Sequence, residues 1–168
     1  MNERKVPEKS IAFYGVTLSL ALVLSYVESL LPMSLGVPGA KLGLANLMTV
    51  FLLYTAGARA AFSISAARIM LSGFMFGNMF AILYSSMGFL FSFLSMLLLK
   101  RSGRFGTVGV SMAGGVMHNV GQLICAAFIA GGYVLMYLPA LLLAGIIAGL
   151  LIGALGAYMI KRVGRYVL

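Results

Sequence analysis

The chain has 168 residues, of which 62% are hydrophobic and only 9% charged, whereas roughly a quarter of the residues in a soluble domain are charged. Together with a mean hydropathy of +1.07, this composition excludes an ordinary soluble protein and indicates one integral membrane domain over residues 1–168. The net charge of +9 does not indicate a nucleic-acid-binding protein, because the basic residues stand in small clusters between apolar runs.

Six apolar segments follow one another along the chain, and each is a candidate membrane-spanning helix. A span needs about 20 apolar residues, and the second and third segments are shorter than this. The first segment follows a basic tail (residues 1–10), as a signal peptide does, but its apolar run is too long and no convincing cleavage site follows it. The predicted spans lie near residues 11–31, 42–56, 60–72, 79–99, 107–130 and 133–160, with loops at 32–40 and 73–78.

The basic residues predict how these spans are oriented. Six spans place both termini on one side, and ten basic residues then fall on that side, in the two tails, at Arg59 and between residues 100 and 104. Only Lys41 falls on the other side. Because loops rich in Lys and Arg stay in the cytoplasm, we expect an all-α, six-transmembrane-helix bundle in the bacterial cell membrane with both termini cytoplasmic.

Glycines in the last span predict close helix packing. Gly145, Gly149 and Gly153 recur every four residues, and small residues at this spacing form a flat ridge on which another helix can pack closely. We therefore assign them to packing rather than to ligand contact.

Polar side chains also lie inside the predicted spans, where each costs free energy unless it is paired or hydrated. At about 1.5 Å per helical residue, Arg68 lies roughly 13 Å and His118 roughly 16 Å from the cytoplasmic end of its span. Gln122 is four residues after His118 and three after Asn119, so it neighbours both on the helix surface. The sequence thus predicts several polar groups at mid-membrane or in its outer half.

Two interpretations of these residues remain open. In the first they form a structural network, in which Arg68 pairs with Glu28 and the polar residues of the fifth span bond across helices. In the second, which we favour, they line an outward-facing pocket with an apolar wall from Met75, Phe76, Met79, Phe80 and Tyr84, because small-molecule sites combine apolar walls with few polar groups. The predicted site residues are Lys41, Asn46, Arg68, Asn78, Tyr84, His118, Asn119 and Gln122.

The residues that catalysis would require are missing from the sequence. The chain has no Asp, whereas a prenyl diphosphate synthase holds magnesium and diphosphate with aspartate-rich motifs, and none of its lysines lies in a phosphate-binding loop. Cys125 is the only cysteine, which excludes an intramolecular disulfide. His118 is the only histidine, and a lone His without Asp is a poor metal site. We expect no enzymatic activity, no catalytic cofactor and no metal.

Three stretches carry a resemblance to a known family. KLGLANLMTVFLLY (41–54), ARIMLSGFMFGN (67–78) and GGVMHNVGQLICAA (114–127) resemble the Gx transporter family, which is often labelled heptaprenyl diphosphate synthase component I. That family is similar to the substrate-binding S-components of energy-coupling factor (ECF) vitamin transporters, which have six helices and an outward-opening pocket. The resemblance implies a transporter subunit and covers nearly the whole chain.

The resemblance also implies a ligand and partners. The association of such proteins with Rnf-type redox complexes and covalent flavin attachment implies a flavin (riboflavin, FMN or FAD) as the transported ligand. The implied partners are an ECF-type coupling subunit with its ATPases, or a redox complex. The first span departs from the Ala-x-x-x-Ala pattern at which many S-components dock, and has Gly15 and Ser19 at this spacing.

Two function classes follow from these observations. The first is a transport protein that binds a vitamin- or cofactor-like molecule in the outer half of the membrane. The second is a non-catalytic membrane subunit of a prenyl diphosphate, quinone or redox assembly. A transporter must bind its ligand without other chains, whereas an assembly subunit need not.

The predicted topology can be checked by labelling in intact cells. Cysteines introduced near Lys5 and Lys161 should resist a membrane-impermeant thiol reagent, whereas one near Gly36 should react, because the charge distribution places both termini inside. Labelling at either terminus would overturn this topology.

Overall fold

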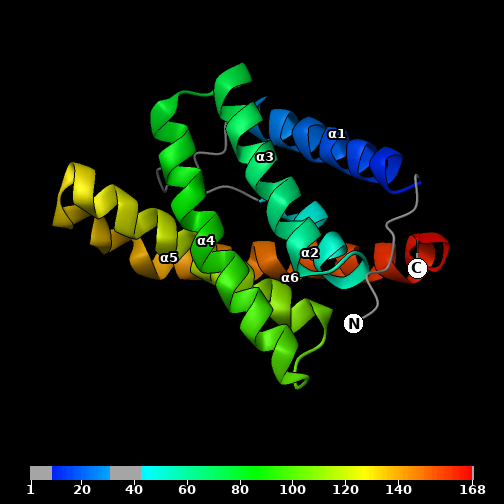
Figure 1. Ribbon diagram of the computed structural model, residues 1–168. Coiled ribbons are helices and arrows are strands. Elements are labelled where there is room, and N and C mark those ends of the chain that lie inside the picture. Colours follow the sequence, from blue (N-terminus) through cyan, green and yellow to red (C-terminus); the bar gives the residue numbers. More distant parts are fainter. Residues whose placement is uncertain (1–8, 31–42, 168) are drawn as a thin grey trace.

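The structure is a computed structural model that describes residues 9–30 and 43–167, and this part of the chain is helical (Figure 1). In Figure 1 the start of α1 and the end of α6 lie toward the same side of the molecule. The six α-helices and one short 3-10 helix are α1 (Lys9–Leu30), α2 (Asn46–Thr55), α3 (Ala58–Phe76), α4 (Met79–Ser102), α5 (Thr107–Ala130), η1 (Gly132–Tyr137) and α6 (Leu138–Val167).

Four of the described helices are long and apolar enough to cross a membrane, namely those within 11–30, 79–102, 107–130 and 132–164. The predicted bounds of α5 are confirmed. The sixth apolar segment is divided, because residues 132–137 form a 3-10 turn and α6 starts only at Leu138. Pro139 stands in the first turn of α6, where its missing N–H costs nothing.

The short span predicted near residues 42–56 corresponds to α2, an apolar helix of only 10 residues that begins at Asn46. At 1.5 Å per residue it is about 15 Å long, half the thickness of the hydrocarbon core. Two glycines at positive φ limit it: Gly43 (φ 69°) forms the turn before it and Gly57 (φ 91°) the break after it. In contrast, α3 continues to Phe76, so the predicted loop at 73–78 shrinks to Gly77 and Asn78.

Helix α6 packs directly on the backbone of α5. A Cβ atom added to Gly149 would lie 2.5 Å from the Cα of Met112, and one added to Gly153 would lie 2.8 Å from the Cα of Val108. Gly145 makes the same kind of contact with the backbone of Gly115. The predicted packing role of the glycine ridge is therefore confirmed.

The opposite side of α5 approaches α4 equally closely. A Cβ atom on Gly121 would lie 2.6 Å from the carbonyl oxygen of Met87, and one on Gly114 would lie 2.7 Å from the Cγ of Met96. Helix α5 is thus held between α4 and α6, and glycines bring the backbones together on both sides.

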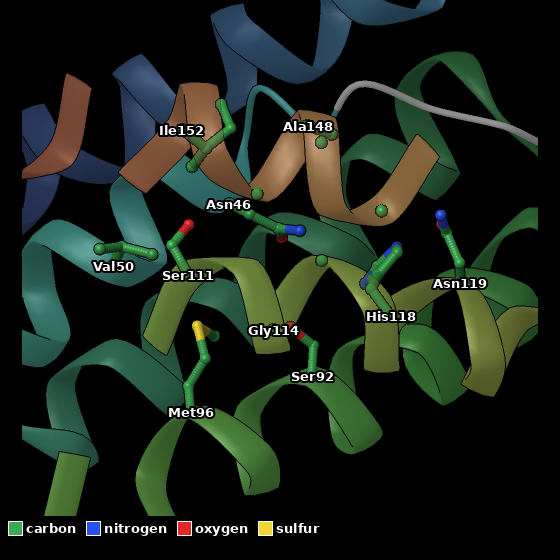
Figure 2. Close-up of a pocket in the computed structure, with 14 residues that line it drawn as sticks. Asn46, Val50, Ser92, Met96, Ser111, Gly114, His118, Asn119, Ala148 and Ile152 are labelled. Atoms are coloured by element: carbon green, nitrogen blue, oxygen red, sulfur yellow. The ribbon is translucent and has the colours of Figure 1, made fainter. Parts of the chain in front are cut away.

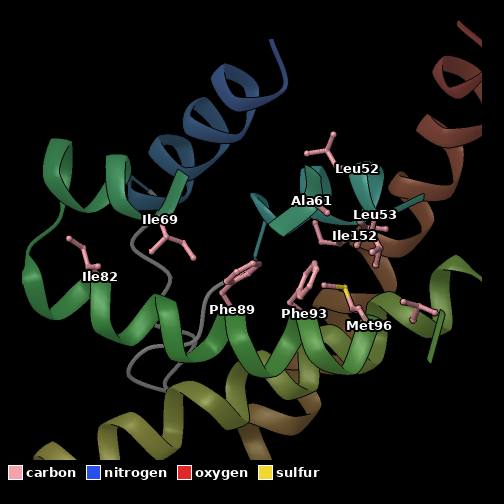
Figure 3. Close-up of a cluster of buried hydrophobic side chains, with 11 residues drawn as sticks. Leu52, Leu53, Ala61, Ile69, Ile82, Phe89, Phe93, Met96 and Ile152 are labelled. Carbon is pink, nitrogen blue, oxygen red and sulfur yellow. The ribbon is translucent and has the colours of Figure 1, made fainter. Parts of the chain in front are cut away.

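Apolar side chains fill the space between α4, α3 and α2. Ile82, Phe89, Phe93 and Met96 follow one face of α4 (Figure 3), as spacings of seven, four and three residues require for a shared helical face. They pack with Ile69 of α3 and with buried residues of α2 and α6. This core holds the first half of the chain against α4.

The glycine contacts predict a pair of opposite mutational effects. Gly149→Ala should lower the melting temperature of the detergent-purified protein, because overpacking against backbone costs about 1–3 kcal/mol. Gly15→Ala is the matched control, because a Cβ atom at Gly15 meets nothing within 4 Å, and Ala is the better helix former. Equal melting temperatures for the two variants would contradict the close packing of α5 and α6.

Candidate functional site

A cavity of about 180 Å³, called here the main cavity, lies where α1 and α3 end and α2 and α4 begin. Its rim includes the exposed residues Ser29 and Gly77, and its interior reaches the buried side chains of Arg68 and Gln122. The described residues that line it are Ser25, Glu28, Ser29, Gly43, Asn46, Arg68, Ile69, Ser72, Gly73, Phe76, Gly77, Ala81, Ser85, His118 and Gln122.

Helix α5 contributes His118 and Gln122, whose spacing of four residues places them on one face. Their side chains lie opposite Gly88 of α4, where an added Cβ atom would come within 2.8 Å of Gln122 Cγ and 2.9 Å of His118 Cε1. The missing side chain at Gly88 therefore makes the space that these two residues occupy between the closely packed helices.

The side chain of Gln122 is 1% exposed, and neither its oxygen nor its nitrogen has a hydrogen-bond partner among the described residues. A primary amide offers two donors and an acceptor, and an unpaired buried polar group costs about 1–3 kcal/mol. An amide buried in this way at the wall of a cavity is therefore available to a ligand or to water.

Arg68 of α3 forms the charged part of the wall. The residue is 8% exposed, its Nη1 donates to the Ser25 hydroxyl at 3.3 Å, and it interacts electrostatically with Glu28. The Glu28 carboxylate also accepts a hydrogen bond from the backbone N–H of Gly43. Both members of the predicted Arg68–Glu28 pair therefore line the main cavity, but each bonds to another group, and no direct ion pair between them is found among the described residues. Nε of Arg68 has no hydrogen-bond partner in the described part of the chain.

Asn119 serves as a structural link rather than as part of the main cavity. Its Nδ2 donates to the carbonyl oxygen of Leu141 in α6 at 2.7 Å, and its side chain points toward α6 in Figure 2. One residue further along a helix is a rotation of about 100°, so Asn119 faces α6 while His118 faces α4. The interpretation of the fifth span as interhelical glue is confirmed for this residue.

A second, inner cavity of about 20 Å³ lies between α2, α4, α5 and α6 and is shown in Figure 2. Asn46 and His118 point into this space, and together with Gly43 they line both cavities. This volume suffices for about one water molecule. Asn46 and His118 therefore lie between the main cavity and this smaller space, which Ser92 and Ser111 also line.

The comparison with known proteins agrees with these observations. The model of the family described as heptaprenyl diphosphate synthase component I matches residues 17–159. The chain belongs to this family. No curated protein and no solved structure matches it. With its four long apolar helices, this member of the heptaprenyl diphosphate synthase component I family is a membrane protein.

Three of the eight predicted site residues do not line either cavity in the described part of the chain. Asn78 is the N-cap of α4, where its side-chain oxygen accepts from the N–H of Ala81 at 2.8 Å, and it is exposed. Tyr84 stacks on Phe80 one helical turn away, while Ala81 and Ser85 occupy the cavity side of α4. Lys41 lies outside the described residues.

The expected apolar wall is also mostly turned outward. Met75, Met79 and Phe80 are exposed, and of the five residues expected there only Phe76 lines the main cavity. Helical periodicity explains the difference, because residues adjacent in sequence differ by about 100° and cannot all face one side.

Sequence reasoning missed the serines of the cavity wall and Gly88. Ser25, Ser72 and Ser85 line the main cavity, but serines in apolar helices often bond to their own backbone, as Ser72 does with the carbonyl oxygen of Ile69. The spacing of Gly88 carried no signal of its own, since only the three-dimensional structure places it opposite His118 and Gln122.

Asn119 and Gln122 should respond differently to substitution. Asn119→Ala should lower the melting temperature, because an interhelical hydrogen bond in a membrane contributes about 0.6 kcal/mol on average and the deletion also leaves a void. Gln122→Met should leave the melting temperature unchanged or raise it, because an apolar side chain of similar size removes an unpaired amide. If the Gln122 variant melted as early as the Asn119 variant, the amide of Gln122 would have to be structural.

Proposed function

We propose that the protein binds a small vitamin- or cofactor-like molecule in the main cavity and carries it across the cell membrane. The observation that carries this proposal is the buried amide of Gln122, which has no hydrogen-bond partner among the described residues and lies in a cavity that also contains Arg68. Structural polar groups in a membrane find partners within the protein, as Asn119 does, whereas intramembrane polar groups left at a cavity mark ligand sites.

The location of the basic residues supports a cavity that opens to the outside. Arg59 begins α3, Lys100 and Arg101 end α4, and Lys161 and Arg162 lie near the end of α6. The main cavity is lined by the C-terminal ends of α1 and α3 and by the start of α4. Arg59, Lys100 and Arg101 therefore lie at the other ends of α3 and α4. With the basic end cytoplasmic, we propose six membrane-inserted helices, of which α2 reaches only halfway, with the main cavity in the outer half.

The size of the cavity favours a compact ligand or one that is only partly enclosed. A cavity of 150 Å³ encloses a molecule of the size of benzene, so about 180 Å³ suits one ring and its substituents. A flavin is our best candidate, with one edge of its ring system held inside and the remainder at the rim. The long nucleotide portion of FAD has no comparable space in the described wall.

The charge of the cavity favours an uncharged ligand. Arg68 and Glu28 are the only Arg, Lys, Asp or Glu side chains among the described wall residues, and they interact electrostatically. The formal charge of this part of the wall is therefore zero, which offers little to attract a phosphate. Among flavins, the main cavity should thus bind riboflavin more tightly than FMN or FAD.

Uphill transport would need an energy source outside this chain, because the sequence has no phosphate-binding loop. We propose that an ECF-type coupling subunit with its ATPases, or a redox complex, supplies it. The chain itself is proposed to have no catalytic cofactor and no enzymatic activity.

The family description supports a second candidate function, a non-catalytic membrane subunit of a prenyl diphosphate synthase assembly. The description names a component of heptaprenyl diphosphate synthase. The chain lacks Asp, so any synthase catalysis would belong to another subunit. This candidate requires a protein partner and does not require the purified chain to bind a vitamin.

A thermal-shift panel on the purified protein separates the two candidates. Riboflavin, FMN, FAD, thiamine, quinones and prenyl diphosphates would each be added, and a ligand at 100-fold its Kd adds about 2.7 kcal/mol of stability. We expect riboflavin to raise the melting temperature most, and Arg68→Gln to reduce this shift.

The control variant is Arg162→Gln, because Arg162 lies over the ring of Tyr158 near the end of α6, away from the main cavity. The Arg162→Gln variant should show the same riboflavin-induced rise in melting temperature as the wild-type protein. Stabilisation by none of the compounds would sink the transport proposal, and stabilisation by prenyl diphosphates alone would favour the synthase-subunit function.

A further inference from the structure

We propose that Gln122 recognises the amide-like edge of a planar heterocycle, in which a ring N–H stands directly beside a ring carbonyl. This inference rests on the proposed function, since it names the chemistry by which the main cavity selects its ligand. It adds to that proposal a specific pair of hydrogen bonds and a class of compounds that should be rejected.

First, both the oxygen and the nitrogen of the Gln122 amide are available for hydrogen bonds to a ligand. Its oxygen and nitrogen are buried without a partner among the described residues, and the residue lines the main cavity. The oxygen accepts a hydrogen bond and the nitrogen donates one. Since leaving either unpaired in the bound state carries a desolvation cost, the best ligand satisfies both.

The second step is geometric. A primary amide presents its donor and its acceptor side by side in one plane, so two parallel hydrogen bonds require a partner with an acceptor beside a donor. Gly88 leaves α4 without a side chain opposite Gln122. One residue before Gln122, Gly121 packs against the backbone of Met87 in α4, so the two helices are in close contact at this level. Because Gln122 is 1% exposed and lines the main cavity, its amide faces the protein interior rather than lipid.

The third step identifies the compounds that fit. The pyrimidinedione edge of a flavin, the ring of uracil and the lactam of a pterin all present N–H beside C=O. A quinone has carbonyls without an adjacent N–H, and a prenyl diphosphate has neither. Nε of Arg68, on the same cavity wall, is a further donor that has no partner within the described ranges, and it suits a second carbonyl of the same ligand.

The test compares lumiflavin, which has the flavin ring system without the ribityl chain, with N3-methyllumiflavin, in which a methyl group replaces the hydrogen on the ring nitrogen N3. Binding to wild-type protein should weaken by roughly 5- to 150-fold on methylation, the equivalent of one buried partner left unpaired. In Gln122→Met the two compounds should bind equally well, because the methionine neither donates a hydrogen bond to this edge nor accepts one from it.

Two further variants keep the test interpretable. Gly88→Ala should weaken lumiflavin binding by displacing Gln122, and it provides a second route if the methionine variant is poorly folded. Ser95→Ala is the control, since Ser95 bonds to the Ser92 carbonyl of its own helix and lines neither cavity; it should keep the full preference for lumiflavin.

The outcomes separate the inference from the proposed function. If wild-type protein binds lumiflavin and its methylated form equally, or if Gln122→Met keeps the preference, the inference fails and the transport proposal stands. If thiamine is the only ligand found, the inference again fails alone, whereas binding of prenyl diphosphates alone would contradict both the inference and the transport proposal. If uracil, pterin and flavin compounds and every other compound of the panel leave the protein unstabilised, both fail.

Discussion

The whole arrangement depends on how closely α5 approaches its two neighbours. Glycines on α6 meet the backbone of α5 at Met112 and Val108, and Gly121 of α5 meets the backbone of α4 at Met87. In a membrane the hydrophobic effect does not drive helices together, so such close backbone packing supplies much of the association. Once α5 is fixed between two helices, the direction of each of its polar side chains is fixed by helical geometry.

This constraint divides the polar residues of α5 into two roles. Asn119 faces α6 and bonds to a backbone carbonyl, so it contributes to stability. Gln122 faces the cavity and keeps its hydrogen-bonding capacity unused within the described protein, which lowers stability unless a ligand or water occupies the site. The two interpretations of the sequence, a structural network and a binding pocket, therefore each describe a part of the same helix.

The sequence was informative where a pattern has one physical meaning. Long apolar runs gave α4 and α5 closely, and the spacing of Gly145, Gly149 and Gly153 indicated backbone packing. The sequence was less informative where local backbone geometry decides the length of a helix or the direction of a side chain. A turn at Gly43 shortens α2, an N-cap uses Asn78, and the facing of Tyr84 depends on a rotation of α4 that composition does not reveal. The role of Gly88 is visible only once two helices distant in sequence lie side by side.

The opposite charges of Arg68 and Glu28 have a consequence for membrane voltage. Moving one elementary charge through 100 mV changes its free energy by about 2.3 kcal/mol. If the cavity wall carried a lone arginine, the resting potential would therefore favour or oppose any conformational change that moved this charge across the membrane. Because Arg68 and Glu28 interact within the same wall, a movement that displaces them together transfers no net charge from this pair. The empty protein would then change conformation without a gating current from these residues, and whether a transport cycle is electrogenic would depend on the ligand and on any co-transported ion.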